Sequence, residues 1–427
     1  MNYRKFSGAA SAAPLIVITI LILAFGAWAQ GTYKTLHKFN GKDGDSPSGR
    51  LIFDTAGNLY GTTNIGGKYS GCYFGTCGTV FELSPNAGGT WTEQVLHNFD
   101  GSDGTAPVGE LIFDGAGSLY GTANRGGGPG DGVVFKLTPG ANGSWTESTL
   151  FVFTGTDGEW PGGGLTFDAS RNLYGTTGWG GDGGNVFELT PNGNGSWTES
   201  VLYVFTFDGI NGWYPSGGSL VFDAAGNIYG TAAFGGKSGC SPYGNGCYGF
   251  GVVFELSPNG NGAWTEKVLH TFQGKDGESP TCTLVFDAAG NLYGTAFAGG
   301  DLSLCSGYGC GVVFELTPNA GGGWTEHVLH KFSGGKDGSV PFAGVVFDAA
   351  GNLYGTTTQG GAHGYGVVFK LTPNSKGGWN ETVLHSFIDS PGAYPYSGLI
   401  FDAAGNLYGS TQGDGTKTFG SVYEITP

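Results

Sequence analysis

The chain has 427 residues, of which 87 are glycine, 39% are hydrophobic and only 12% are charged, and its net charge is −16. Glycine at this level without a Gly-X-Y period excludes collagen, and the hydrophobic content, with 14% aromatic residues, excludes a disordered chain. An acidic protein repels phosphate backbones and anionic lipids, so neither nucleic acid nor a membrane surface is an expected partner.

Residues 1–29 have the features of an export signal. Arg4 and Lys5 supply the positive start, an apolar run covers residues 15–25, and Ala-Trp-Ala at 27–29 suits signal peptidase. We expect cleavage rather than retention as a membrane anchor. The mature chain would keep 16 basic and 34 acidic residues, a net charge of −18. The expected location is extracytoplasmic, either secreted or periplasmic.

One stretch, FDAAGNLYGT at residues 286–295, recurs with small changes along the chain. A period of this length is typical of a repeat architecture. The aspartate of the stretch recurs at intervals of 54 to 64 residues, at Asp54, Asp114, Asp168, Asp223, Asp287, Asp348 and Asp402.

Each repeat contains four strand-like runs separated by turns, and no run shows a helical period. Four antiparallel strands repeated around a ring are typical of a β-propeller. We therefore predict an all-β fold in which residues 30–427 form a single seven-bladed domain. The blades are expected near 51–99, 111–153, 165–205, 219–272, 284–332, 345–387 and 399–427.

The two ends of the chain are out of phase with the repeat. Residues 31–39 match a fourth strand alone, and residues 421–427 match a third strand with no fourth behind it. We predict that the N-terminal strand is the outer strand of the last blade and closes the ring. Such pairing would remove two exposed sheet edges.

The order of the segments GLIFD, GNLYGT, GVVFELTP and VLHxF resembles the tandem repeat of exported bacterial proteins known as the Gloeobacter/Verrucomicrobia repeat. Its first half is also similar to the strand pair of NHL-like propellers. The resemblance covers residues 31–427 and implies an extracytoplasmic propeller with LxFD as the innermost strand. It implies no activity for named residues. Some relatives add a C-terminal surface anchor, whereas this chain ends at the final strand, so surface attachment is in doubt.

Strand order then sorts the loops onto two faces. The short turns after the first and third strands lie on one face. The loops after the second and fourth strands vary in length and lie on the other, which we call the variable face. Variable loops on a rigid scaffold are where function is usually found.

Seven cysteines in an exported chain suggest disulfides. Six of them form the close pairs Cys72–Cys77, Cys240–Cys247 and Cys305–Cys310, whose spacings lack the CxxC knuckles of zinc sites. We predict three disulfides that stiffen loops and no metal site. Cys282 is left over, either as a buried thiol or with a partner that the sequence does not identify.

Residues that recur in most copies are expected to serve the blade. The aspartates of FDAAG and the histidines of VLHxF belong to this class, and Phe151 or Tyr203 replaces the histidine in two copies. Arg50 and Glu110 depart from the pattern near the axis, where they would pair or line the axial opening. No GxSxG or HExxH motif is present, and no catalytic residue or cofactor is predicted.

Three tryptophans also depart from the repeat. Trp160, Trp179 and Trp213 fall in variable-face loops of the third and fourth blades, with Asp182 and Tyr214 beside them. Flat aromatic rings with polar edges suit a sugar, so these five residues are the predicted ligand-binding set. The alternative is that the rings fill gaps between glycine-rich loops.

We therefore expect a monomeric, exported binding module that recognises a glycan or an extracellular protein through its variable face. One alternative is a hydrolase or lyase acting on a polysaccharide or lactone, with two acids, or His363 and one acid, converging around the axis. The other alternative is a structural component of the surface or matrix. The off-pattern acids available to an enzyme are Glu110, Asp131, Glu159, Asp182 and Asp301.

Overall fold

The computed structural model describes residues 31–427 except 73–74, 216, 237–248, 261, 391 and 414–417. The predicted leader and the predicted Cys240–Cys247 pair lie outside the described residues. Within the described part, no helix has the length and apolar character needed to cross a membrane.

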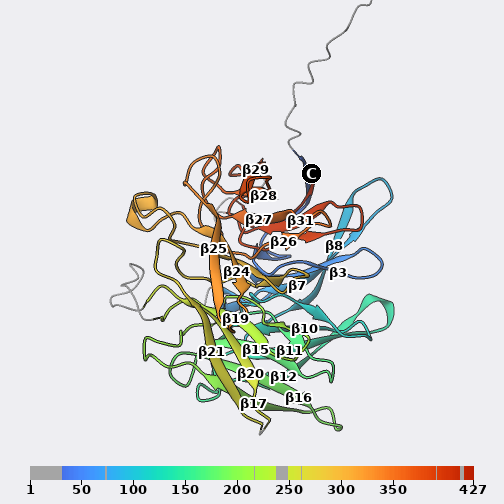
Figure 1. Ribbon diagram of the computed structural model, residues 1–427. Helices are drawn as coiled ribbons and strands as arrows, with labels where there is room; N and C mark the ends of the chain where they lie inside the picture. The colour runs from blue at the N-terminus through green and yellow to red at the C-terminus, as the bar shows by residue number, and fades with distance from the viewer. Residues whose placement is uncertain are drawn as a thin grey trace, which may run out of the picture.

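The predicted seven-bladed β-propeller is confirmed: seven antiparallel sheets of at least four strands stand around a common axis (Figure 1). The innermost strands are β3 (Ile52–Phe53), β9 (Ile112–Phe113), β14 (Thr166–Phe167), β18 (Val221–Phe222), β22 (Val285–Phe286), β26 (Val346–Phe347) and β30 (Ile400–Phe401). The second strands are β4 (Leu59–Ile65), β10 (Leu119–Ala123), β15 (Leu173–Trp179), β19 (Ile228–Ala232), β23 (Leu292–Ala296), β27 (Leu353–Thr357) and β31 (Leu407–Thr411).

The third and fourth strands form the outer half of each blade. The third strands are β7 (Thr79–Pro85), β11 (Val133–Pro139), β16 (Asn185–Pro191), β20 (Val252–Pro258), β24 (Val312–Pro318), β28 (Val367–Pro373) and β32 (Ser421–Thr426). The outermost strands are β8 (Trp91–Asn98), β12 (Trp145–Val152), β17 (Trp197–Val204), β21 (Trp264–Thr271), β25 (Trp324–Lys331), β29 (Trp379–Ser386) and β1 (Thr32–Lys38). Short strands β2 (Asp45–Pro47) and β13 (Glu159–Pro161) join β4 and β15, and β5 (Ser70–Cys72) and β6 (Gly75–Thr76) form a small hairpin.

The N-terminal strand closes the ring, as predicted. β1 pairs antiparallel with β32, from Thr32 opposite Thr426 to Lys38 opposite Ser421, and the last sheet runs β1-β32-β31-β30. The blue start and the red end of the described chain therefore lie side by side (Figure 1). Because β1 pairs with β32, the outer edge of β32 is covered and β1 becomes the outermost strand of the last blade.

The recurrent aspartate accepts hydrogen bonds from the turn that follows it. In the fifth blade, Asp287 Oδ1 accepts the backbone N–H groups of Ala289 at 2.8 Å and Asn291 at 2.9 Å. Its Oδ2 accepts the amide of Asn291 at 2.8 Å and the hydroxyl of Tyr293 at 3.2 Å. Burial alone would raise the pKa of Asp287, but these hydrogen bonds outweigh it and lower the pKa. The carboxylate is thus fully used in building the turn.

The glycine of LYGT is required by packing between the strands of one blade. A Cβ on Gly294 would lie 2.7 Å from the ring of Phe314 on the neighbouring strand, closer than real side chains approach. The equivalent glycines of the other blades meet an aromatic ring of the third strand in the same way. Because glycine has no side chain, a large aromatic ring can fill the middle of each blade.

Aromatic rings also join each blade to the next. Phe99 follows the outermost strand of the first blade and packs on Phe135 in the third strand of the second blade, with ring centroids 5.1 Å apart. Six further contacts of this kind, at 5.1 or 5.2 Å, complete the ring: Phe153–Phe187, Phe205–Phe254, Phe272–Phe314, Phe332–Phe369, Phe387–Tyr423 and Phe39–Phe81. We call these seven contacts the aromatic girdle.

The histidines of VLHxF lie at the same interfaces. His270 pairs with Asp276 at 3.1 Å, and Glu326 of the next blade faces both side chains. The corresponding pairs are His37–Asp43, His97–Asp103 and His330–Asp337. Burial raises the pKa of the facing glutamate to about 7 at Glu93, Glu199, Glu266, Glu326 and Glu381. These carboxyl groups therefore remain protonated well above the pH at which a solvated glutamate ionises.

The closing interface uses a different contact. Tyr33 of β1 occupies the place of the glutamate and stacks on His385, with ring centroids 4.1 Å apart and planes within 7°. Burial, together with the charge of His363, lowers the pKa of His385 to about 4, so the stacked imidazole is neutral at neutral pH. This interface thus has a stacked pair of rings in place of the trio of histidine, aspartate and glutamate.

Two of the predicted disulfides, Cys72–Cys77 and Cys305–Cys310, are confirmed. Each closes a loop after the second strand of its blade. Cys282 is a buried free thiol whose Sγ accepts the backbone N–H of Thr295 at 3.2 Å. Burial raises the pKa of this thiol, which keeps it protonated.

Tyr33→Ala should destabilise the closed ring, because it removes the stack on His385 and ring contacts to Phe387 and Tyr423. We expect a loss of about 2 kcal/mol in the free energy of unfolding, measured by urea denaturation. Lys34→Ala, an exposed neighbour on the same strand, is the control and should change stability by less than about 0.5 kcal/mol. Equal effects of the two substitutions would contradict the assigned role of Tyr33.

The inter-blade glutamates should make the protein less stable as pH rises. The pKa of Glu326 is raised from 4.5 to about 7, so its neutral form contributes stability that is full below pH 4.5 and lost as pH rises through 7. His270, Asp276 and Lys331 are the titratable groups that face it. Glu326→Gln should therefore raise the free energy of unfolding at pH 8 by on the order of 1 kcal/mol and change it little at pH 5.

The matched control is Asp182→Asn, which alters an exposed carboxylate and should leave the pH dependence unchanged. Urea titrations of the three proteins at pH 5 and pH 8 make the comparison. Destabilisation by Glu326→Gln at both pH values would show that the glutamate acts as an ion and refute the assignment.

Candidate ligand pocket and aromatic cluster

A pocket of about 740 Å³ lies on the axis of the propeller. Segments that precede the innermost strands of all seven blades line it, together with residues that follow several second strands. Both kinds of segment lie on the variable face, so the pocket belongs to that face. Its volume falls in the range of pockets that hold small ligands.

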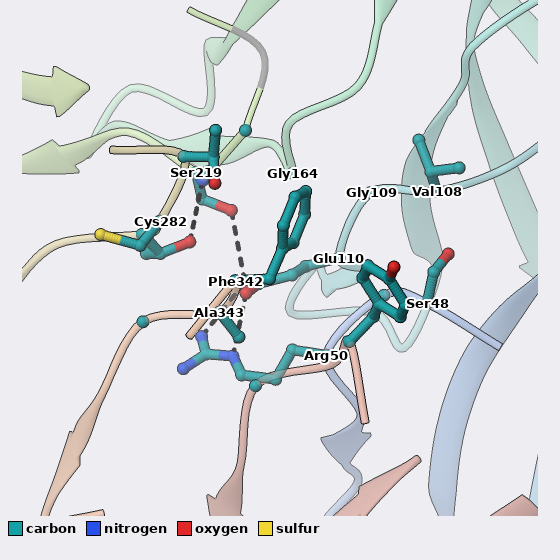
Figure 2. Close-up of a pocket in the computed structure, with 18 of the residues that line it drawn as sticks. Ser48, Arg50, Val108, Gly109, Glu110, Gly164, Ser219, Cys282, Phe342 and Ala343 are labelled. Atoms are coloured by element: carbon teal, nitrogen blue, oxygen red, sulfur yellow. Dashed lines mark hydrogen bonds and ion pairs between the residues drawn. The ribbon is translucent and has the colours of Figure 1, made fainter. Parts of the chain in front are cut away.

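An ion pair that departs from the repeat forms part of the wall. Arg50 and Glu110 occupy equivalent positions in the first two blades, with Nε to Oε1 at 3.1 Å and Nη2 to Oε2 at 3.2 Å. The hydroxyl of Ser219 donates to the same Oε2 at 3.2 Å. Figure 2 shows the guanidinium and the hydroxyl approaching the carboxylate from different sides. The pair that the sequence suggested is therefore formed, and it lines the axial pocket.

Three amide side chains extend this polar wall. Asn64, Asn124 and Gln412 occupy equivalent positions at the ends of the second strands of the first, second and seventh blades, which are neighbours in the ring. No donor among the described residues reaches the buried Oδ1 of Asn64. Asn64, Asn124 and Gln412 thus add amide donors and acceptors to the wall of the pocket.

Aromatic side chains form another part of the wall. Phe342 and Tyr396 occupy equivalent positions in the sixth and seventh blades, and their ring centroids lie 5.3 Å apart. Burial raises the pKa of Tyr396, so its hydroxyl is a neutral donor. The pocket therefore combines hydrogen-bonding groups with flat apolar surface.

Sequence reasoning missed the two rings and the three amides, although a signal for them exists. The residue after the proline of each entering loop is Ser48, Val108, Gly162, Thr281, Phe342 or Tyr396 in the blades where it is described, so the two rings depart from small neighbours. The same position-by-position comparison would have singled out Asn64 and Asn124.

The predicted ligand-binding residues are largely brought together, in a group that we call the aromatic cluster. Trp179 is central, with ring centroids at 5.8 Å from Trp160, 5.9 Å from Trp213 and 6.5 Å from Tyr214. Trp213 is only 7% exposed and stacks on Phe234 at 4.4 Å, so it packs beneath the others. Asp182 is exposed in the loop after β15. Ligand binding by these residues stays a prediction.

The off-pattern acids are distributed over several places. Glu110 is the one carboxylate among the described residues that line the axial pocket. Asp131 and Glu159 lie near each other beside Trp160, where burial and the charge of Asp131 raise the pKa of Glu159. Asp182 and Asp301 are exposed on separate loops.

Two inter-blade trios have the composition of a metal site. In His37, Asp43 and Glu93, and in His270, Asp276 and Glu326, the nearest ligand atoms lie within 4.8 Å of one another. The same trio of residue types recurs at the interfaces of His97 and His330. Because the arrangement repeats with the blades and its glutamate favours the protonated form, we interpret it as part of the inter-blade packing.

Comparison with solved structures finds matches that cover most of this chain at low sequence identity. A gluconolactonase from Xanthomonas campestris has 12% sequence identity and a TM-score of 0.40, covering 73% of this chain and 82% of its own. The PQQ-bound aldose sugar dehydrogenase from Streptomyces coelicolor has 12% identity and a TM-score of 0.44, covering 93% and 98%. A protein of unknown function from Dyadobacter fermentans has 12% identity and a TM-score of 0.41, covering 92% and 98%.

Sequence comparison places the repeat in a family. No curated protein matches the chain. The family model of the Gloeobacter/Verrucomicrobia repeat matches residues 70–245 and again residues 240–427. The two matches cover most of the propeller, and the chain therefore belongs to the Gloeobacter/Verrucomicrobia repeat family.

Proposed function

We propose that this protein is an exported sugar-binding module whose ligand occupies the axial pocket on the variable face. The observation that carries the proposal is the composition of the pocket wall. Hydrogen-bonding side chains from blades one, two and seven share it with the rings of Phe342 and Tyr396. A sugar ring offers hydroxyl groups at its edge and C–H groups on its faces, which matches this combination.

The polar groups suit a neutral ligand. Arg50 is compensated by Glu110, so the pair presents donors and acceptors without a net charge. The side-chain amides of Asn64, Asn124 and Gln412 can donate to or accept from sugar hydroxyl groups. An anionic ligand would meet the strongly acidic surface of the chain, whose net charge disfavours its approach.

The number of acidic side chains in the pocket wall favours binding over hydrolysis. A two-carboxylate glycosidase needs a second acid roughly 5 to 10 Å from the first across the scissile bond. The described wall of the pocket supplies Glu110 alone, and that carboxylate is occupied by Arg50 and Ser219. Export is supported by the sequence of residues 1–29 and by the two disulfides, which persist in oxidising compartments.

The double variant Phe342→Ala/Tyr396→Ala should lose sugar binding, because it removes the aromatic part of the wall. On a glycan array, the wild-type protein should retain at least one sugar, and the variant should weaken its binding by about 100-fold, or roughly 1.4 kcal/mol for each ring. Asn64→Ala should weaken it by about tenfold, through the loss of one hydrogen bond.

Tyr69→Ala is the matched control, because Tyr69 is an exposed aromatic residue that does not line the axial pocket. It should bind sugar as the wild-type protein does. Wild-type affinity in the Phe342/Tyr396 variant, or an array on which the wild-type protein retains no sugar, would refute the proposed function.

A further inference from the structure

We propose that the axial pocket and the aromatic cluster are one continuous site for a linear oligosaccharide, joined at Tyr214. This inference rests on the proposed sugar-binding function and adds the length of the ligand and its path. One end of the sugar chain occupies the pocket, and the following units run outwards over Tyr214, Trp179 and Trp160.

Tyr214 belongs to both regions. It lines the axial pocket, and its ring lies 6.5 Å from that of Trp179 and 6.1 Å from that of Phe234. From Trp179 the path continues to Trp160, and the two ring centroids lie 5.8 Å apart. The guanidinium carbon of Arg125 lies 4.4 Å from the ring centroid of Trp160. Ring-to-ring contacts therefore lead without a break from the axis to the boundary between the second and third blades.

The backbone fixes the two ends of this path. Tyr214 and Trp160 are equivalent residues that precede a proline and hold positive φ angles of 62° and 59°. Each donates its N–H to a carbonyl of the preceding blade, Tyr214 to Gly183 at 2.8 Å and Trp160 to Asp131 at 2.9 Å. A non-glycine residue keeps such a conformation only when its surroundings enforce it. Both rings are thus presented by a rigid frame, which lowers the entropy lost on binding.

The equivalent residues of the other blades show that the path is local. They are Ser46, Ala106, Ser279, Val340 and Tyr394. Blades three and four are therefore the neighbouring blades that both carry an aromatic residue at this position. At the position of Trp179, the neighbouring blades carry Arg125 and Phe234, whereas the fifth to seventh blades carry Ala298, Gln359 and Gly413. The scaffold requires no ring at these positions, so packing of the repeat does not explain the series.

The surface along the path is accessible and has a polar edge. Phe207, which contacts Trp179 at 5.8 Å, is 51% exposed, and Trp160 and Trp179 are partly exposed. Buried Trp213 supports the cluster from below, at 5.0 Å from Phe207. Glu159 and Asp131 lie beside Trp160 and offer acceptors for hydroxyl groups. A sugar chain offers hydroxyl groups that can pair with these carboxylates, whereas an apolar polypeptide would only desolvate them, which favours a sugar chain as the occupant.

The test measures how affinity depends on the length of the sugar. Isothermal titration uses cello-, malto-, xylo-, manno- and chito-oligosaccharides of one to six units with the full mature chain. In at least one series, affinity should rise by about tenfold or more between the first and the longest member, because each added stacking contact strengthens binding. Trp179→Ala should abolish this gain while leaving affinity for the single sugar within about twofold of the wild-type value.

Two further variants keep the test independent of folding. Phe207→Ala changes an exposed ring and should also reduce the gain in affinity with sugar length. It replaces Trp179→Ala in the test if that variant does not fold. Ile388→Ala changes an exposed apolar residue in the corresponding loop of the sixth blade and should have no effect. Thermal unfolding of each variant verifies that the blades are intact.

The outcomes separate this inference from the proposed function. The extended site would be overturned if affinity were independent of sugar length in every series. It would also be overturned if Trp179→Ala weakened the affinity for a single sugar and for a six-unit chain equally. Either result would leave the pocket assignment standing. A wild-type protein that binds no member of any series would contradict both.

Discussion

The aromatic girdle is the contact on which the rest of the structure depends. Each blade is a small sheet that buries little by itself, and the ring stands because a phenylalanine after each outermost strand packs on the third strand of the next blade. The glycine of LYGT makes this packing feasible, since it leaves room for the ring inside the blade. The last blade is completed by both ends of the chain: Tyr33 of the N-terminal strand stacks on His385 of the preceding blade, beside the contact of Phe387 with Tyr423.

A scaffold this regular leaves few positions free to vary, and those positions collect on the variable face. The segments entering the innermost strands converge on the axis from all seven blades, so a change in any one of them alters the same pocket. Arg50 and Glu110 on one side and Phe342 and Tyr396 on another make an asymmetric wall inside a symmetric ring. The ligand chemistry proposed for the pocket follows from that asymmetry.

Much of the fold could be predicted from the sequence, because the features that specify it recur. Seven copies of an aspartate turn gave the number of blades, and the orphan strand at residues 31–39 gave the closure. The recurrent aspartates and histidines serve the blades, as their recurrence indicated, with Asp287 engaged by its own turn and His270 by Asp276. The position of the glutamates in the same interfaces could not be foreseen, since it depends on how neighbouring blades meet.

The site was predictable only in part, for a physical reason. The gathering of Trp160, Trp179 and Tyr214 follows from the strand order, which puts their loops on one face of adjacent blades. The axial pocket depends on the radius of the ring and on side chains that converge from distant repeats, and no local pattern encodes either. Burial also distinguishes Trp213, which supports the cluster, from Trp179, which is partly exposed.

The most direct test of the central claim is a crystal structure of the mature protein with the sugar that it retains most strongly on the array. The account predicts density for a sugar ring on the propeller axis, with one face against Phe342 or Tyr396 and a hydroxyl within hydrogen-bonding distance of Asn64. A sugar bound elsewhere on the molecule, with the axial pocket filled by water alone, would contradict it.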